Sequence, residues 1–255
     1  MDKFVIYPKL KNFAMLENIQ LDKIFFLDIE TVPQFEKYEN VPETFKELWN
    51  LKADRIIKDE SASAEDVYER AGIYAEFGKI VCISVGLFTK KDNSLQFRLK
   101  SFYGDDEKQI LADFGQMLDV HFNVNKNYLC AHNGKEFDFP YISRRMIIHG
   151  LPLPEPIDNW GKKPWETVHL IDTMHLWRFG DYKSYTSLNL LCASLDIPTP
   201  KDDISGKDVW KVYWQEKDLE RIVKYCEKDV LAIARLMQRY KRVELIDDNN
   251  VEHIS

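Results

Sequence analysis

The sequence predicts a mixed α/β fold, because segments with a strand pattern alternate along the chain with segments of helical pattern. Residues 24–27 form an apolar run that predicts a first, buried strand. Residues 80–88 and 95–102 predict two further strands, which a short polar turn joins as a hairpin. Near the C-terminus, apolar residues recur at spacings of three and four, which indicates an amphipathic helix: Leu219, Ile222, Val223, Cys226, Val230, Ile233, Met237 and Tyr240.

The remaining elements are expected from shorter patterns. Successive prolines exclude a helix from residues 151–156, so these residues are expected to form an extended loop. The other expected elements, in chain order, are a helical region at 42–75 with Trp49 and Tyr74 as apolar anchors, a helix at 105–120, a strand at 128–131, a helix from residue 138, a last strand at 169–171 and a mostly helical remainder.

The two ends of the chain are expected to lie outside the main domain. Residues 1–20 would form an N-terminal extension, residues 21–245 a single domain and residues 246–255 a C-terminal tail. Met15 is an alternative native start, in which case residues 1–14 would be an added extension.

The composition indicates a globular protein with a packed core. Hydrophobic residues make up 45% of the chain, which is ample for a packed core. Four dispersed cysteines at positions 82, 130, 192 and 226 favour reduced thiols in a cytoplasmic protein. No apolar stretch approaches the roughly 18 residues that a membrane span needs, and the N-terminus lacks a secretory signal pattern, so no membrane partner is expected.

The net charge of −7 does not identify a partner in either direction. An enzyme that processes a chain end needs less positive charge than a protein that coats a duplex. Six basic residues are candidates for local contacts with phosphates: Lys135, Arg144, Arg145, Lys201, Lys207 and Lys211.

Two acidic residues end the first expected strand. Asp28 and Glu30 alternate along that strand, so their side chains should point to the same face. Two carboxylates at the end of a buried strand repel each other unless a cation neutralises them. Oxygen ligands alone favour magnesium or manganese over zinc. Acidic residues also end strands as ordinary turn formers, so this pair alone leaves both interpretations open.

Two later motifs add acidic residues. Asp138 stands at the expected start of a helix, where the helix dipole favours negative charge, and Asn133 precedes it by five residues. A simple N-cap aspartate after a glycine turn explains Asp138 equally well. Tyr225 and Asp229 are four residues apart at the edge of the apolar face of the last helix, a position that suits a cleft wall or an ordinary helix surface.

In this order, the three motifs resemble those of the DnaQ-like 3′–5′ exonucleases of the DEDDy subgroup. Among these the chain is most similar to the stand-alone predicted exonucleases related to the proofreading domain of family B DNA polymerases. The resemblance extends from Leu21 to Tyr240 and is carried by four stretches: 26–33, 131–141, 171–174 and 217–230. It implies a ribonuclease-H-like sheet of five strands, flanked by helices, with the active site at the first strand.

The resemblance also implies a role for each motif residue. Asp28 would bridge two divalent metal ions, magnesium or manganese. Glu30 and Asp229 would hold the first ion, and Asp138 would hold the second, partly through water. Tyr225 would contact the attacking water, which places the chain in the tyrosine rather than the histidine subgroup. Two metal ions about 3.5–4 Å apart activate a water and stabilise the leaving oxygen in such a displacement.

The expected substrate is the 3′ end of single-stranded nucleic acid, DNA rather than RNA. Asn133 and Phe137 are candidates for contacts with the terminal nucleotides, although a turn asparagine and a core phenylalanine explain them as well. Thr31 and Lys207 complete the nucleic-acid-binding candidates. Any polymerase, helicase or repair partner would be a separate chain.

Other interpretations stay open. His169, Asp172 and His175 are spaced by three and suggest a second metal site, but a helix-capping or cleft-supporting Asp172 is favoured. Five tryptophans in the second half are expected in the core rather than on a stacking surface: Trp160, Trp165, Trp177, Trp210 and Trp214. Competing functions are an RNA-trimming exonuclease, an endonuclease of the ribonuclease H kind and a binding module without catalysis.

Overall fold

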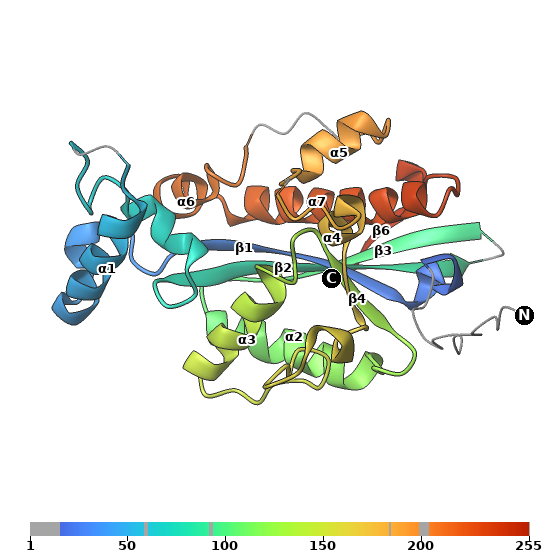
Figure 1. The fold of residues 1–255 in the computed structure, drawn as a ribbon, viewed down its shortest axis with the longest axis horizontal. Helices are drawn as coiled ribbons and strands as arrows, with labels where there is room; N and C mark the ends of the chain where they lie inside the picture. Colours follow the sequence, from blue (N-terminus) through green and yellow to red (C-terminus); the bar gives the residue numbers. More distant parts are fainter. Residues whose placement is uncertain (1–15, 59–60, 92–93, 184, 199–203, 255) are drawn as a thin grey trace, which may run out of the picture.

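A computed structural model describes residues 16–58, 61–91, 94–183, 185–198 and 204–254. A single six-stranded sheet forms its centre, and helices cover both faces (Figure 1). The strands are β1 (Ile24–Pro33), β2 (Gly78–Lys91), β3 (Ser94–Tyr103), β4 (Tyr128–Ala131), β5 (Leu170–Asp172) and β6 (Val251–Ile254). The helices are α1 (Glu43–Ile56), α2 (Glu107–His121), α3 (Asp138–Ile148), α4 (Thr173–Arg178), α5 (Leu188–Ser194), α6 (Val209–Lys211) and α7 (Leu219–Tyr240). Residues 1–15, with the alternative start Met15, and Lys201 lie outside the described residues.

The strand order across the sheet is β5-β4-β1-β2-β3-β6. β1, β2 and β3 pair antiparallel in succession, while β4 pairs parallel to β1, and β5 parallel to β4. This arrangement of β1 to β5 confirms the expected ribonuclease-H-like sheet. The sixth strand was not expected: β6, in the segment interpreted as a tail, pairs parallel with β3 at the sheet edge. Its four residues are too few to show a strand pattern in the sequence.

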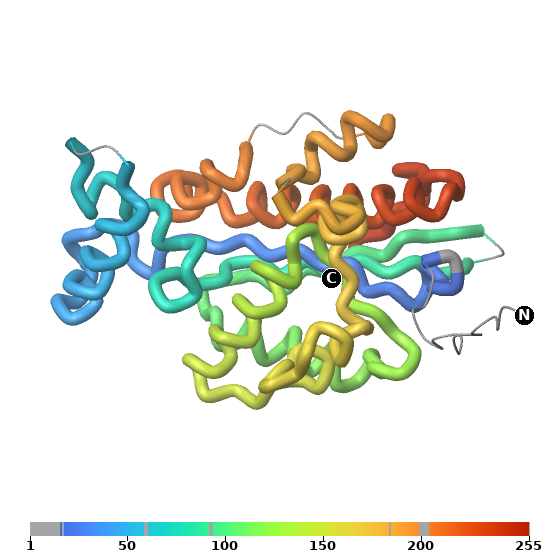
Figure 2. Tube along the Cα trace, viewed as in Figure 1, coloured from blue at the N-terminus to red at the C-terminus, as the bar shows by residue number. Residues whose placement is uncertain are grey.

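β1 divides the core, because its alternate side chains enter different layers. Phe25, Leu27 and Ile29 pack into the layer that α2 and α3 cover. Ile24 and Phe26 pack into the opposite layer, beneath α7. Figure 2 shows α7 running along one face of the sheet, with α2 and α3 beneath the other. Asp28 and Glu30 continue the second series, so the register of β1 turns both carboxylates toward α7.

The helical region expected at 42–75 is split. α1 ends at Ile56, where Ile57 is already extended, and a short 3-10 helix follows only at Tyr68–Ile73. Between them the carboxylate of Asp66 accepts hydrogen bonds from the backbone N–H and the hydroxyl of Ser63, which stabilises a turn instead of a helix. Trp49 lies at the centre of this region, with its indole N–H bonded to the carbonyl of Ala64.

The prediction that Arg145 contacts phosphates is wrong, because Arg145 forms a buried ion pair. Its guanidinium donates to Glu107 on α2 and to the carbonyl of Ala75. Glu107 also accepts from the backbone N–H of Ile80, so this pair joins α2, α3 and β2. The helical pattern around Arg145 contains no signal that distinguishes a buried arginine from an exposed one.

Candidate active site

Asp28, Glu30 and Cys226 form the centre of the site. An oxygen of each carboxylate and the Sγ atom of Cys226 all lie within 4.8 Å of one another. Glu30 is buried, and a register shift between Glu30 and Thr31 in the β1–β2 pairing falls directly beside it. Such irregularities re-aim side chains and are common next to functional sites.

α7 contributes three residues: Tyr225 and Cys226, which are adjacent in the chain, and Asp229, about one turn later. The Cys226 thiol donates to the backbone carbonyl of Asp28 at 3.4 Å and to its carboxylate at 3.6 Å, which fixes the helix against β1. Tyr225 and Asp229 flank this thiol, and the Tyr225 hydroxyl hydrogen-bonds to Asp229 one turn later. The sequence pattern indicated this face of α7, but it gave no sign of the contact that Cys226 makes with Asp28.

Asp138 enters the site from a third segment. It is the first residue of α3 and is buried, and the backbone N–H of Ile29 on β1 donates a hydrogen bond to it. The start of α3 is thereby joined to β1 between Asp28 and Glu30. Together, the strand and two helices bring all four predicted carboxylates within electrostatic reach of one another.

Burial and the repulsion of neighbouring acids hold the carboxyls of Asp28, Glu30 and Asp138 toward their neutral form. Burial raises the pKa of Asp28 most, and the charges of Asp138, Glu30 and Asp229 raise it further. Burial followed by Asp229 likewise raises the pKa of Glu30, and burial raises the pKa of Asp138 to about 7. The electrostatic effects that raise these two pKa values come from other acidic groups, among them Asp138 and Asp229. A bound cation would counter this repulsion.

The donor set fits a hard divalent ion. Carboxylate oxygens are the ligands that Mg²⁺ and Mn²⁺ prefer. Four of them would offset the charge of two such ions. Within the described residues, the group around Asp28 and Glu30 is the single cluster of three metal-ligating side chains that comes this close together.

Comparison with known proteins identifies the family. A family model described as a predicted 3′–5′ exonuclease related to the exonuclease domain of PolB matches residues 73–250, more than half of the chain. The chain belongs to this exonuclease family. The matched residues contain Asp138, Tyr225 and Asp229 but begin after β1, so the family match itself does not include Asp28 or Glu30.

Solved structures offer a weaker comparison. A family B DNA polymerase from the hyperthermophilic archaeon Pyrobaculum calidifontis is 16% identical, with a TM-score of 0.45 over 86% of this chain. The chain spans only about a quarter of that polymerase, 27% of its length, and at this score the similarity supports no functional conclusion. No curated protein matches the sequence significantly. Among the described helices, none is long and apolar enough to cross a membrane.

Asp172 positions the loop that leads to Asp138. Its side chain is fully buried and accepts from the backbone N–H groups of Asn133 at 3.1 Å and Lys135 at 3.0 Å. It also caps α4 by accepting from the N–H groups of Met174 and His175. The expected capping role of Asp172 is therefore confirmed, and its bonds to Asn133 and Lys135 hold the segment that precedes Asp138.

The alternative metal site at His169, Asp172 and His175 does not form. His169 bonds to the carbonyl of Pro156 at 2.9 Å, and His175 bonds to the carboxylate of Glu136 at 3.2 Å. The strand-to-helix junction turns the two imidazoles toward different segments, so the regular spacing does not bring them together.

Asp172→Ala is expected to lower the free energy of unfolding by about 1–3 kcal/mol, the cost of leaving buried donors without a partner. Asp172→Asn keeps one side-chain oxygen, which can still accept the hydrogen bonds that Oδ1 accepts from the backbone. It should therefore lower the free energy of unfolding less than Asp172→Ala does. Urea unfolding of both variants measures this, with the exposed Asp181→Ala as the matched control. Equal midpoints for Asp172→Ala and wild type would contradict the supporting role.

The four candidates for nucleic-acid contact occupy different surroundings. Asn133 has a positive φ of 63°, and its buried Oδ1 has no hydrogen-bond partner among the described residues. The Phe137 ring lies 5.3 Å from that of Tyr141 and packs against the core beneath the sheet. The Thr31 hydroxyl hydrogen-bonds to the phenol of Tyr141. Lys207 is exposed in the turn before α6.

Two of the tryptophans expected in the core are at the surface. Trp160 is 72% exposed and Trp165 is 66% exposed. Both lie in the connection between α3 and β5, which contains only a short 3-10 helix and therefore presents no apolar face to the core. By contrast, Trp177 stacks on Tyr240 of α7, and the Trp214 indole donates to the carbonyl of Pro33.

Proposed function

We propose that this protein is a metal-dependent 3′–5′ exonuclease that hydrolyses phosphodiester bonds at the 3′ ends of single-stranded nucleic acid, DNA rather than RNA. One observation carries the proposal. Four carboxylates and a tyrosine from β1, α3 and α7 converge on one buried site in a chain that belongs to a family of predicted 3′–5′ exonucleases.

The proposed ligands of two divalent ions, magnesium or manganese, are the four carboxylates Asp28, Glu30, Asp138 and Asp229. When bound, the ions supply neutralising charge, activation of a water molecule and stabilisation of the leaving oxygen. The raised pKa values of Asp28 and Glu30 support this assignment, because the site is costly to ionise without a cation.

Tyr225 is proposed to orient the attacking water. Burial and the negative charge of Asp229 raise the pKa of the Tyr225 phenol far above its usual range, so the phenol keeps its proton at neutral pH. A permanently protonated phenol is not a general base, but it can hold a water molecule by hydrogen bonding. Its bond with Asp229 fixes its direction.

Asn133, Phe137, Thr31 and Lys207 are proposed to contact the substrate. The strongest support concerns Asn133, because a buried amide oxygen without a partner is rare and a hydroxyl of the terminal sugar would satisfy it. Phe137 is only partly buried, which leaves a ring edge for a terminal base. A cytoplasmic location is proposed because the four cysteines are free and buried.

The experiment that tests this function compares linear and closed circular single strands of DNA and RNA in the presence of Mn²⁺. A 3′-labelled linear DNA strand is expected to release labelled mononucleotide as its first product, and the circle is expected to remain closed. The RNA strand should be cut more slowly. Opening of the circle would instead identify an endonuclease, and faster cutting of RNA would identify an RNA-trimming enzyme.

A further inference from the structure

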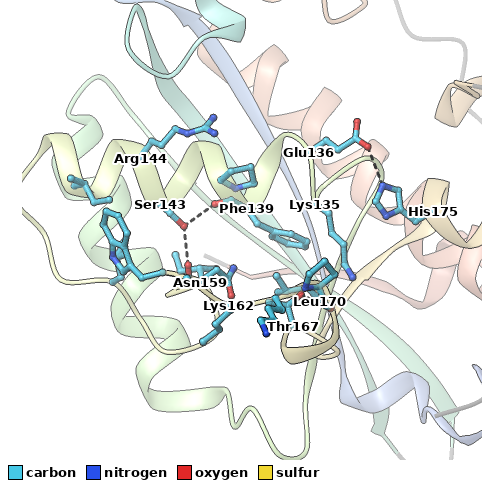
Figure 3. A pocket seen from close by; sticks show the side chains of 18 of the residues that line it. Lys135, Glu136, Phe139, Ser143, Arg144, Asn159, Lys162, Thr167, Leu170 and His175 are labelled. Carbon is cyan, nitrogen blue, oxygen red and sulfur yellow. Dashed lines mark hydrogen bonds and ion pairs between the residues drawn. The ribbon is translucent and has the colours of Figure 1, made fainter. Parts of the chain in front are cut away.

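A cleft lies beside α3, outside the candidate active site. It has a volume of about 730 Å³ and is bounded by α3 and by the connection from Ile157 to Thr167 (Figure 3). Its wall includes Lys135 and Phe139, which stand on either side of the site residue Asp138 in the chain. The carboxylates themselves do not line it. The cleft and the candidate active site therefore share one segment of chain but are separate sites.

The lining of this cleft is basic in an acidic protein. Three lysines and one arginine line it: Lys135, Lys162, Lys163 and Arg144. The lining contains a single carboxylate, that of Glu136. Glu136 is already engaged with Arg178 and His175, each at 3.2 Å. Arg144 and Lys162 form no ion pair within the described part of the chain. In Figure 3 they extend from α3 and from the facing connection, respectively. The cleft thus concentrates positive charge suited to phosphate groups.

Exposed aromatic rings accompany this charge. Trp160 is 72% exposed and Tyr182 is 80% exposed, and both line the cleft. Aromatic faces next to basic side chains are the combination that binds single-stranded nucleic acid, since bases stack on the rings while the backbone meets the cations.

One polar atom in the cleft lacks a partner. The side-chain oxygen of Asn159 is buried but accepts no hydrogen bond from the described residues. Figure 3 shows Asn159 near Ser143, whose hydroxyl bonds to the carbonyls of Phe139 and Ile157 and so ties α3 to the connection. A buried acceptor of this kind is normally satisfied, and an exocyclic amine of a nucleobase is a donor that would do so.

We propose that this cleft is a second nucleic-acid subsite, which binds a nucleotide of the single strand away from the bond that is cleaved. A base stacks on Trp160 and Tyr182, and the flanking phosphates meet Arg144 and Lys162. The inference rests on the proposed function for the class of ligand, but binding in the cleft does not require cleavage.

The test measures the affinity of a fluorescein-labelled 12-nucleotide single strand by anisotropy, in EDTA so that the strand stays intact. Trp160→Ala should weaken binding about fivefold or more, the usual value of one stacked base. Arg144→Ala and Lys162→Ala should each reduce the slope of log affinity against log salt by about 0.7, as expected for one lost phosphate contact. All three residues are exposed, so the variants should fold.

Two exposed residues outside the cleft provide matched controls. Trp165→Ala removes a neighbouring tryptophan and Lys108→Ala removes a lysine on α2, and both should bind as wild type does. Wild-type affinity for Trp160→Ala and the two charge variants would overturn the subsite. If the wild-type protein cleaves no strand but Trp160→Ala weakens binding, the subsite stands and the proposed catalytic function fails.

Discussion

Asp28→Ala and Asp229→Ala are expected to lower single-turnover cleavage of a single-stranded oligonucleotide by more than about 100-fold, whereas Tyr225→Phe should retain measurable activity. Mutation of a group that only supports a metal ligand typically lowers metal affinity or activity by about 10–100-fold. Mutation of a proposed ligand itself should therefore lower the rate by more. Tyr225 is instead proposed to act through a hydrogen bond to water, and Phe preserves its packing on α7 while removing only the hydroxyl.

The measurement is the observed rate with enzyme in excess over strand, at saturating Mn²⁺. Asp119→Ala, an exposed carboxylate on α2, is the matched control and should cleave at the wild-type rate. Comparable rates for Asp28→Ala, Asp229→Ala and Tyr225→Phe would refute the division between ligands and a water-orienting tyrosine.

Metal ions are expected to stabilise the protein strongly at pH 8 and weakly at pH 5. A carboxyl whose pKa is raised on folding binds more protons in the folded than in the unfolded state. Its contribution to stability is therefore present at acidic pH and is lost as the pH rises through the folded-state pKa, which is about 7 for Asp138. In metal-free protein, ionising this cluster should cost a few kcal/mol at pH 8, and a bound cation should restore that stability.

Asp28→Asn separates this effect from the titration of other groups. Without metal, the variant should be more stable than wild type at pH 8, because an amide removes one of the repelling charges while keeping the side chain's size. It should also gain less from Mn²⁺. Urea unfolding at pH 5 and pH 8, in EDTA or in Mn²⁺, provides the four comparisons. An identical Mn²⁺ response in wild type and Asp28→Asn would show that Asp28 does not bind the ion.

The sequence predicted the sheet and the carboxylates because both depend on local, periodic signals. Alternation along β1 gives the common face of Asp28 and Glu30, and the spacing of apolar residues gives the buried stripe of α7 beside Tyr225 and Asp229. The expectation that these residues converge came only from the ordered set of motifs, because no single stretch of chain specifies contacts between β1 and α7.

The features that were missed depend on three-dimensional context. Cys226 reads as one more apolar residue of α7, and only the approach of β1 places its thiol on Asp28. Trp160 is a typical core residue by type, but it lies in a connection that has no apolar face to bury. Arg145 is buried because Glu107 of another helix meets it, a contact that spacing along α3 cannot indicate.

The most direct test of the proposed site is cleavage of a 5′-labelled single-stranded DNA oligonucleotide with Mn²⁺, Mg²⁺ or EDTA. We expect a ladder of products that shortens from the 3′ end with either ion, and an intact strand in EDTA. An intact strand with both ions, from folded protein, would contradict the assignment of the four carboxylates to a catalytic metal site.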